Sequence, residues 1–160
     1  MTPLTAPQLR RTFVNMSKGE ASRINLPELD EQPWNDLDYL GWVDPKAPMR
    51  AYLVTEHGGS LRGIGLRLST EARGPRKTMC ALCHTVGDVA LMVAPRAGSA
   101  GRSGNSVGTY ICADLACSLY VRGRRRASAS LAEETLTPEQ KTARLVTNLG
   151  AFVARVLRTD

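Results

Sequence analysis

The pattern of hydrophobic and polar positions is clearest near the C-terminal end of the chain. There, apolar residues recur at intervals of three or four: Leu145, Val146, Leu149, Phe152, Val153 and Val156. This spacing places them on one face of an α-helix. Residues 137–140, Thr-Pro-Glu-Gln, form a capping box with proline at the first helical position, so the helix is expected to begin there. The pattern predicts an amphipathic C-terminal helix whose apolar face docks on β-hairpins.

A second helix is predicted near the N-terminus. Residues 5–8, Thr-Ala-Pro-Gln, also have the sequence of a capping box, and Leu9, Phe13 and Met16 follow at helical spacing. A glycine that follows them is expected to end this helix near residues 17–18.

The middle of the chain predicts two β-hairpins. Residues 51–55 and 61–68 have the composition and alternation of strands, and residues 57–60, His-Gly-Gly-Ser, form a turn between them. We expect this hairpin to stand on its own. Residues 89–93 and 107–111 are the candidate strands of the second hairpin.

The segments between these strands differ in character. Residues 34–42 contain both tryptophans, which we expect to be partly buried beside a short helical turn. Residues 73–77 form a basic connector, and residues 95–105, rich in Gly, Ser and Arg, predict a mobile loop tip. A helix is expected from Asp114 to Val121, closed by the arginine-rich run that follows it.

These elements predict an α+β fold with small antiparallel hairpins, an N-terminal helix and a C-terminal amphipathic helix. Residues 1–70 would hold the first helix and the first hairpin. Residues 71–160 would hold a close pair of cysteines, the second hairpin, a second pair at a helix start, and the C-terminal helix; this order of elements predicts a treble-clef zinc finger. We expect the two subregions to form one compact unit.

The zinc prediction rests on four cysteines in two close pairs. Cys80 and Cys83 have the spacing of a metal-binding turn, whereas Cys112 lies at the end of a predicted strand and Cys117 in the first turn of a predicted helix. Backbone N–H groups of such a turn and of a helix N-terminus favour thiolates. Four thiolates suit tetrahedral Zn²⁺ and leave no position open for water or substrate. The alternative is four reduced, partly buried thiols.

Composition agrees with a small zinc-dependent fold. Aromatic residues make up 5% of the chain, so a metal cross-link would support a lean core. No apolar run approaches the roughly 20 residues that span a bilayer, and residues 1–5 lack the form of a signal peptide. The chain is therefore predicted to be cytoplasmic, where thiols stay reduced, with no membrane partner.

The net charge of +6 is concentrated in the cysteine-bearing part of the chain. Residues 61–126 carry 11 basic and 3 acidic side chains, whereas residues 1–60 carry 6 and 8 and residues 127–160 carry 4 and 4. Such a basic region favours an RNA, DNA or acidic protein partner. The alternative is that the charge serves solubility alone.

No catalytic constellation is recognisable. Asp38, Glu56 and Asp114 have no partner in a motif, and Asp114 is placed as an acid in the first turn of a helix. His84 is interpreted as a neighbour of the metal site or a surface residue, and His57 as a solvated turn residue. The sequence therefore predicts a protein that is not an enzyme and has no small-molecule substrate.

Three segments carry a resemblance to a known family. Residues 79–84, 89–94 and 108–118 resemble the C-terminal treble-clef zinc finger of elongation factor G-binding proteins, the FBP-domain proteins of the fusidic-acid-resistance type. Residues 13–21 and 37–42 are similar to shorter, stand-alone members. The resistance members bind elongation factor G through the zinc-finger domain and help it leave a drug-stalled ribosome. The resemblance implies structural zinc with four ligands: Cys80, Cys83, Cys112 and Cys117.

Two functions follow as hypotheses. The first is a zinc-binding adaptor that binds elongation factor G or the ribosome and modulates translation. The second is a nucleic-acid-binding module for ribosomal RNA, acting through the same basic surface. The expected partner-binding residues are Arg96, Arg102, Tyr120, Arg122, Arg124, Arg125 and Arg126.

Overall fold

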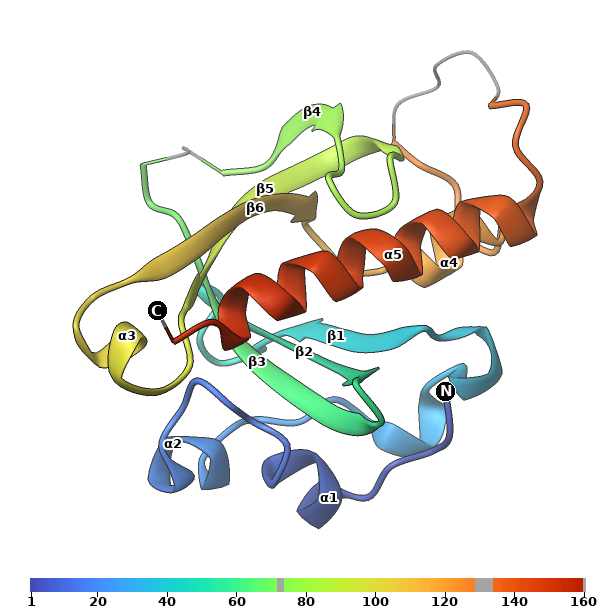
Figure 1. The fold of residues 1–160 in the computed structure, drawn as a ribbon. Helices are drawn as coiled ribbons and strands as arrows, with labels where there is room; N and C mark the ends of the chain where they lie inside the picture. Colours follow the sequence, from blue (N-terminus) through green and yellow to red (C-terminus); the bar gives the residue numbers. More distant parts are fainter. Residues whose placement is uncertain (72–73, 129–133, 160) are drawn as a thin grey trace.

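An antiparallel β-sheet forms the centre of the molecule (Figure 1). The structure, a computed structural model, describes residues 1–71, 74–128 and 134–159. Helix α5 crosses one face of the sheet and the N-terminal segment lies against the other, which confirms the α+β prediction. Within the described residues the sheet has six strands: β1 (Tyr39–Val43), β2 (Arg50–His57), β3 (Ser60–Leu68), β4 (Arg76–Met79), β5 (Val86–Pro95) and β6 (Ser106–Cys112).

Strand β5 joins the two halves of the sheet. Near its C-terminal end it pairs with β3, at Arg67↔Val93, and near its N-terminal end with β4, while β6 runs along its other edge. The prediction that residues 51–68 form a hairpin on its own is wrong, because β3 continues into this pairing. Strands from both predicted subregions, residues 1–70 and residues 71–160, therefore belong to one sheet.

Both predicted hairpins are present. Strands β2 and β3 are joined by Gly58 and Gly59, whose φ angles of +61° and +75° match the two-residue turn that suits the right-handed twist of paired strands. Strands β5 and β6 pair from Val89↔Cys112 to Pro95↔Ser106. Each strand is longer than its predicted segment by one residue or more at one or both ends.

The sheet has a hydrophobic core on each face. In β2, Ala51 and Leu53 point into the core beneath α5, whereas Tyr52 and Val54 point toward the N-terminal segment. All four are buried, because both faces of β2 are covered. The core beneath α5 also contains the four cysteines, so the metal centre is part of the main core.

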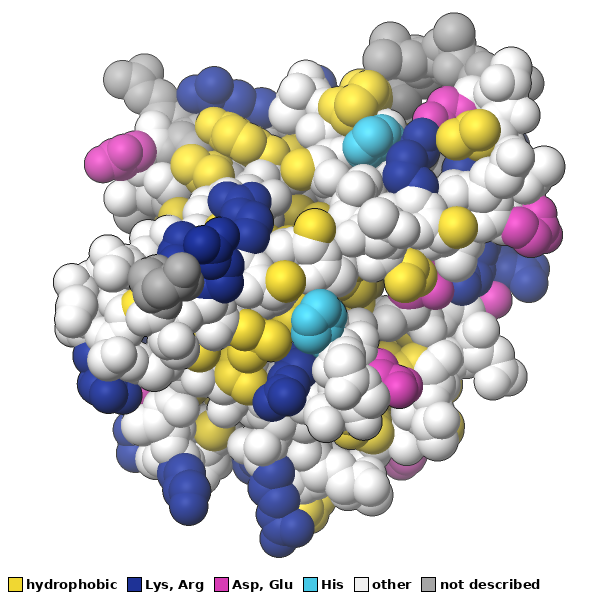
Figure 2. Space-filling model, viewed as in Figure 1, with side chains coloured by type: hydrophobic (Ala, Val, Ile, Leu, Met, Phe, Trp, Pro, Cys, Tyr) yellow, Lys and Arg dark blue, Asp and Glu magenta, His cyan; other side chains and the backbone are white. Residues whose placement is uncertain are grey.

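Helix α5 (Pro138–Leu157) follows the prediction closely. Thr137 caps it as expected, with its hydroxyl accepting a hydrogen bond from the backbone N–H three residues on, at 3.2 Å. Val146, predicted to widen the buried face, is instead 51% exposed, since it is rotated by about 100° from its buried neighbour Leu145. It borders a groove of about 970 Å³ between α5 and the β2–β3 turn. In Figure 2, hydrophobic side chains are visible along both sides of α5.

No helix in the described part of the chain, α5 included, has the length and apolar character needed to cross a membrane.

The N-terminal helix is shorter than predicted. Helix α1 spans Ala6–Arg10, and a separate helix α2 (Lys18–Ser22) begins where the first was expected to end. Between them, Phe13 forms a bridge with Gly63 of β3. A Cβ at Gly63 would lie 2.4 Å from Oγ1 of Thr12, so glycine allows the chain to run this close to the sheet. Pairing with β3 therefore interrupts the helical pattern.

A short 3₁₀ turn, η2 (Trp34–Asp36), lies in the segment where one helical turn was predicted, and a second one, η1 (Leu29–Glu31), precedes it without having been predicted. Trp34 and Trp42 are 8% and 6% exposed, and each indole N–H donates to a backbone carbonyl of the preceding segment. Strand β1, which follows, is not predicted by the sequence because its residues are apolar on both faces.

Two connecting segments are more regular than predicted. The segment over residues 95–105 contains helix α3 (Gly98–Arg102), where Ala100 is buried, instead of an irregular loop. The N–H of Ala97 donates to the carbonyl of Val156 at 2.8 Å, which ties α3 to the end of α5. The last two residues of the predicted basic connector, Arg76 and Lys77, begin strand β4; the connector's first residue, Arg73, lies outside the described residues.

Candidate metal centre

The first pair of ligands lies in a tight turn between β4 and β5. The carbonyl of Cys80 accepts a hydrogen bond from the N–H of His84 at 3.0 Å, and its N–H donates to the carbonyl of Thr85 at 2.9 Å. His84 has a φ of +61°, which closes the turn. The N–H groups of Leu82 and Cys83 point at Sγ of Cys80, at 3.4 and 3.5 Å. The backbone therefore holds a thiolate at Cys80, as the spacing predicts.

The second pair lies between β6 and helix α4 (Cys117–Val121). Cys112 ends β6 and Cys117 begins α4, so both positions agree with the prediction. The helix does not open at Asp114, however, because Leu115 has a φ of +57° and turns the chain first. Asp114 accepts a hydrogen bond from the N–H of Ala116 at 3.0 Å and shapes this turn, instead of serving as an acid in the first helical turn.

The four sulfurs have the arrangement of a tetrahedral zinc site. All four Sγ atoms lie within 4.8 Å of one another, and all four residues are buried. The Cys80–Cys117 and Cys83–Cys112 sulfur distances are 3.7 and 3.6 Å. A tetrahedron with Zn–S bonds of about 2.3 Å has edges of about 3.8 Å, which is close to these distances. The donor set and its size fit structural Zn²⁺.

Thiol chemistry also favours a cation at this centre. Hydrogen bonds from the thiols of Cys112 and Cys117 lower the pKa of Cys80 and that of Cys83, because they stabilise the two thiolates. The pKa of Cys117 is raised, first by its hydrogen bond to Cys112 and then by those to the first pair. Four adjacent thiolates repel one another, so part of the cluster keeps its protons until Zn²⁺ supplies the compensating charge.

A tyrosine missed by sequence reasoning gives an independent test of this fit. The hydroxyl of Tyr39 on β1 is buried and has no hydrogen-bond partner among the described residues. It lies beside Cys117; burial raises the pKa of the phenol, and the charge on Cys117 adds to this effect. A buried hydroxyl needs an acceptor. A zinc-bound thiolate of Cys117 is a suitable one, so the orphaned hydroxyl matches a metal-thiolate centre.

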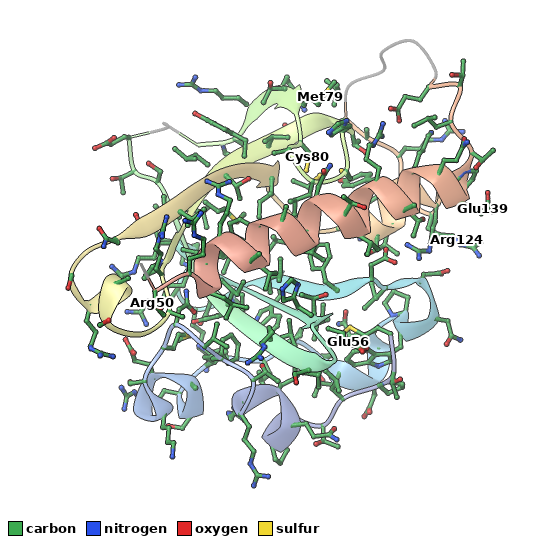
Figure 3. The ribbon with its side chains drawn as sticks, viewed as in Figure 1. Arg50, Glu56, Met79, Cys80, Arg124 and Glu139 are labelled. Atoms are coloured by element: carbon green, nitrogen blue, oxygen red, sulfur yellow. The ribbon has the colours of Figure 1, made fainter. Side chains whose placement is uncertain are left out.

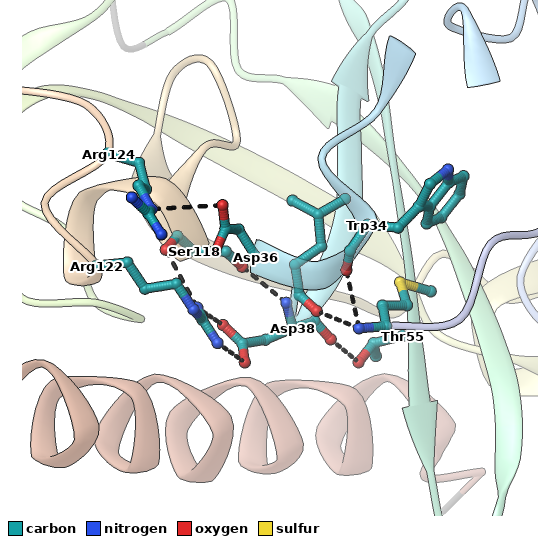
Figure 4. A network of polar contacts seen from close by, with 9 residues as sticks. Trp34, Asp36, Asp38, Thr55, Ser118, Arg122 and Arg124 are labelled. Carbon is teal, nitrogen blue, oxygen red and sulfur yellow. Dashed lines mark hydrogen bonds and ion pairs between the residues drawn. The ribbon is translucent and has the colours of Figure 1, made fainter. Parts of the chain in front are cut away.

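The helix that carries Cys117 is tied to the entry of β1 (Figure 4). The guanidinium of Arg122 donates to both carboxylate oxygens of Asp38, at 2.6 and 2.9 Å. The N–H of Asp38 donates to Oγ of Ser118 at 3.0 Å, and Oγ1 of Thr55 donates to the Asp38 carbonyl at 3.2 Å. The metal centre is therefore fixed to the first half of the sheet. Sequence reasoning placed Asp38 near no partner because 84 residues separate it from Arg122.

Helix α5 holds the other side of the centre. Asn148 donates from Nδ2 to the carbonyl of Leu82 at 2.9 Å, and Arg144 donates to the carbonyl of Cys83 at 3.1 Å. Arg144 is held in turn by Glu134, at 2.7 Å. These contacts were not predicted, although the spacing of four residues between Arg144 and Asn148 places both on one helix face.

The predicted partner-binding residues do not form one surface. Arg96 is half-buried and Arg102 exposed near α3, at the end of the β5–β6 hairpin away from the cysteines. The others lie in or after α4, and several have partners within the chain. Arg122 binds Asp38, whereas Tyr120 and Arg125 both contact Asp114, at 2.7 and 3.1 Å.

Several exposed arginines lie at the α4 end. Arg124 has 66% of its side chain exposed and makes a 3.4 Å ion pair with Asp36, and Arg126 is exposed. Figure 3 shows Arg124 at one end of the molecule, Arg50 at the other, and Cys80 above α5. Whether these arginines contact a partner stays a prediction.

Comparisons with known proteins agree with this geometry. The family model described as the FBP C-terminal treble-clef zinc-finger matches residues 8–156. The structure of the fusidic acid resistance protein FusC is similar, with a TM-score of 0.65 and 19% identity, over 96% of this chain and 59% of FusC. That likeness concerns the fold, and the chain spans less than two thirds of FusC. No curated protein matches the sequence.

The family match extends over the sheet, the cysteine cluster and nearly all of α5. The cluster provides the four sulfurs that a treble-clef zinc finger needs. The chain therefore belongs to the FBP C-terminal treble-clef zinc-finger family, with structural zinc held by its four cysteines.

Proposed function

We propose that this chain is a zinc-dependent, non-enzymatic adaptor that acts in the cytoplasm, binds elongation factor G and modulates translation. The observation that carries the proposal is a closed four-sulfur centre in a chain of the FBP family with the fold of FusC. Because four protein ligands leave no open position on zinc, the metal would support a binding surface rather than perform chemistry.

The α4 end of the molecule supplies the contact surface in this proposal. Its position is fixed by Cys117 and by the Arg122–Asp38 ion pair, so the arginines beyond it project from a rigid base. Arg124 and Arg126 are exposed there. Exposed arginines steer association with an acidic partner and make binding sensitive to salt.

The test is a titration of purified elongation factor G with the zinc-loaded chain, in which isothermal titration calorimetry measures binding at low and at physiological salt. We expect a complex that weakens as salt rises. The double variant Arg124→Glu/Arg126→Glu should weaken it, because both charges are reversed. Arg102→Glu, at the opposite end, is the matched control and should bind as the unmodified chain does. No complex at low salt would refute the proposal.

A further inference from the structure

One face of the sheet is covered at β1, β2 and β3 and left open along most of β5 and β6. The N-terminal segment packs on β1, β2 and β3 and reaches the C-terminal end of β5, because Asn15 donates to the carbonyls of Gly65 in β3 and Pro95 in β5, each at 2.9 Å. Farther along the sheet, the same face of β5 and β6 stays accessible. Tyr110, directly opposite Leu91, is 42% exposed.

Apolar and aromatic groups form the middle of this open part. Strand register places Leu91 and Val93 of β5 on one face with Tyr110 and Gly108 of β6. Leu91 and Val93 are half-buried, and a Cβ at Gly108 would meet nothing nearer than Leu91, at 3.5 Å. The result is a flat surface with one exposed aromatic ring.

Arginines border this surface on the β3 and β4 side. Arg67 pairs with Val93, so it lies on the face of Tyr110. Arg76 is on β4, about 13 Å farther along β5, opposite Val89, whose own side chain is buried in the core beneath α5. Arg50 lies next to Arg67 in the register. All three arginines are exposed.

One carboxylate lies close to these arginines. Glu20 accepts a hydrogen bond from the N–H of Ser17 at 2.9 Å as a helix cap and keeps its negative charge beside Arg50 and Arg67. Asp88 is paired with Lys77 at 2.6 Å. The three arginines outnumber the one carboxylate of Glu20, so this part of the surface keeps a net positive charge.

We propose that this open part of the sheet, formed by Arg50, Arg67, Arg76, Leu91, Val93, Gly108 and Tyr110, binds single-stranded RNA. The exposed ring of Tyr110 offers a stacking platform for a base, and the arginines lie where they can hold phosphates on either side of it.

The chemistry favours RNA over a protein partner. Three apolar side chains are few for the core of a protein interface, which buries about 800 Å² on each side. A single base, by contrast, needs only one aromatic ring on which to stack, and this surface offers one. Ser106 lies on the same face and is exposed, so its hydroxyl can bind a ribose 2′-hydroxyl, which DNA lacks.

The experiment uses the zinc-loaded chain and fluorescein-labelled oligouridylate, with anisotropy measured over a range of salt concentrations. The logarithm of the binding constant should fall with the logarithm of salt with a slope of about −2, for roughly three phosphate contacts. Arg67→Glu and Arg76→Glu should each weaken binding and reduce the slope by about 0.7. Tyr110→Ala should weaken it roughly 5- to 140-fold with the slope unchanged, whereas Tyr110→Phe retains binding.

The controls separate this surface from that of the proposed adaptor function. Arg124→Glu should leave RNA binding unchanged, and Arg67→Glu should leave elongation factor G binding unchanged. The RNA proposal is overturned if the unmodified chain fails to bind at low salt, or if Tyr110→Ala binds normally. Displacement by polyglutamate with no effect of Tyr110→Ala would identify an acidic-protein surface instead. Equally tight binding of oligodeoxythymidylate would contradict the assignment to RNA.

Discussion

The N-terminal segment and the zinc-bearing segment lie on the same sheet but are held to it by different forces. The N-terminal segment depends on burial: Leu9 is fully buried, Trp34 nearly so, and Phe13 packs at an edge-to-face angle on Tyr52, with ring centroids 5.8 Å apart. The zinc-bearing segment also buries apolar side chains, Leu82, Leu115 and Val121, but its sharp turns bring the four cysteines together in the same core. In addition to this burial, it is held by the four sulfurs and by polar contacts from α5.

The comparison indicates that, in a chain with few aromatic residues, metal binding can add to the stabilisation that hydrophobic packing gives elsewhere. Where apolar side chains are available, the segment packs without a cross-link. Where the chain must turn sharply, at His84 and Leu115, the metal can supply the free energy that local packing cannot. The two regions should therefore respond differently to metal removal and to overpacking.

The largest expected effect is loss of the metal. Cys83→Ser removes one ligand, and because metal binding is part of the folding free energy of such centres, we expect loss of cooperative thermal unfolding. Circular dichroism melting with and without a chelator measures this. Chelation should lower the melting temperature of the unmodified chain and leave the non-cooperative melting curve of Cys83→Ser unchanged. A variant that melts like the unmodified chain would show that the cysteines are not ligands.

The second effect tests the packing of the N-terminal segment. Gly63→Ala places a methyl group against Thr12 and Phe13, and we expect a loss of about 1–3 kcal/mol in the free energy of unfolding. Gly108→Ala is the matched control, since its methyl group meets only Leu91 at ordinary contact distance. Urea denaturation compares the two. Equal stability of both variants would mean that the N-terminal segment is not held tightly on β3.

The third prediction concerns the link between the two regions. Asp38 and Arg122 have side chains only 11% and 23% exposed and share a bidentate ion pair. In a double-mutant cycle with Asp38→Asn and Arg122→Gln, we expect a coupling free energy of about 1–3 kcal/mol, measured by urea denaturation. The exposed Lys77–Asp88 pair serves as the comparison and should give less than about 1 kcal/mol. Additive effects of Asp38→Asn and Arg122→Gln would show that the two side chains do not stabilise each other.

The smallest effect on stability is expected for Tyr39→Phe, which removes only the orphaned hydroxyl. If that hydroxyl donates to the thiolate of Cys117, zinc affinity should fall roughly 10-fold, and the charge-transfer absorption of the Co²⁺-substituted protein should shift. Competition with a chromophoric chelator measures the affinity. Tyr52→Phe is the control, because its hydroxyl contacts Asp44, away from the metal. Identical affinity and spectra for Tyr39→Phe would place the hydroxyl outside the metal centre.

Much of the fold could be predicted where local sequence and tertiary packing agree. The capping box at Thr137, the two hairpins and the spacing of the cysteines each specify their structure within a few residues. The N-terminal helix could not be predicted correctly, because its apolar residues satisfy a helix and a strand-like approach to β3 equally well. The exposure of the predicted partner-binding arginines could not be predicted, because arginines close in sequence, such as Arg122 and Arg124, have very different exposure in the fold.

What the sequence determined by itself is the chemistry of the centre: four cysteines at metal-binding spacing, and the helix and hairpin signals that surround them. What only the tertiary structure decided is which distant groups meet there. Tyr39, Asp38, Arg144 and Asn148 reach the centre across separations that no local pattern records. The physical reason is that hydrogen bonds and caps depend on near neighbours in the chain, whereas a buried polar contact depends on how the whole sheet brings its strands together.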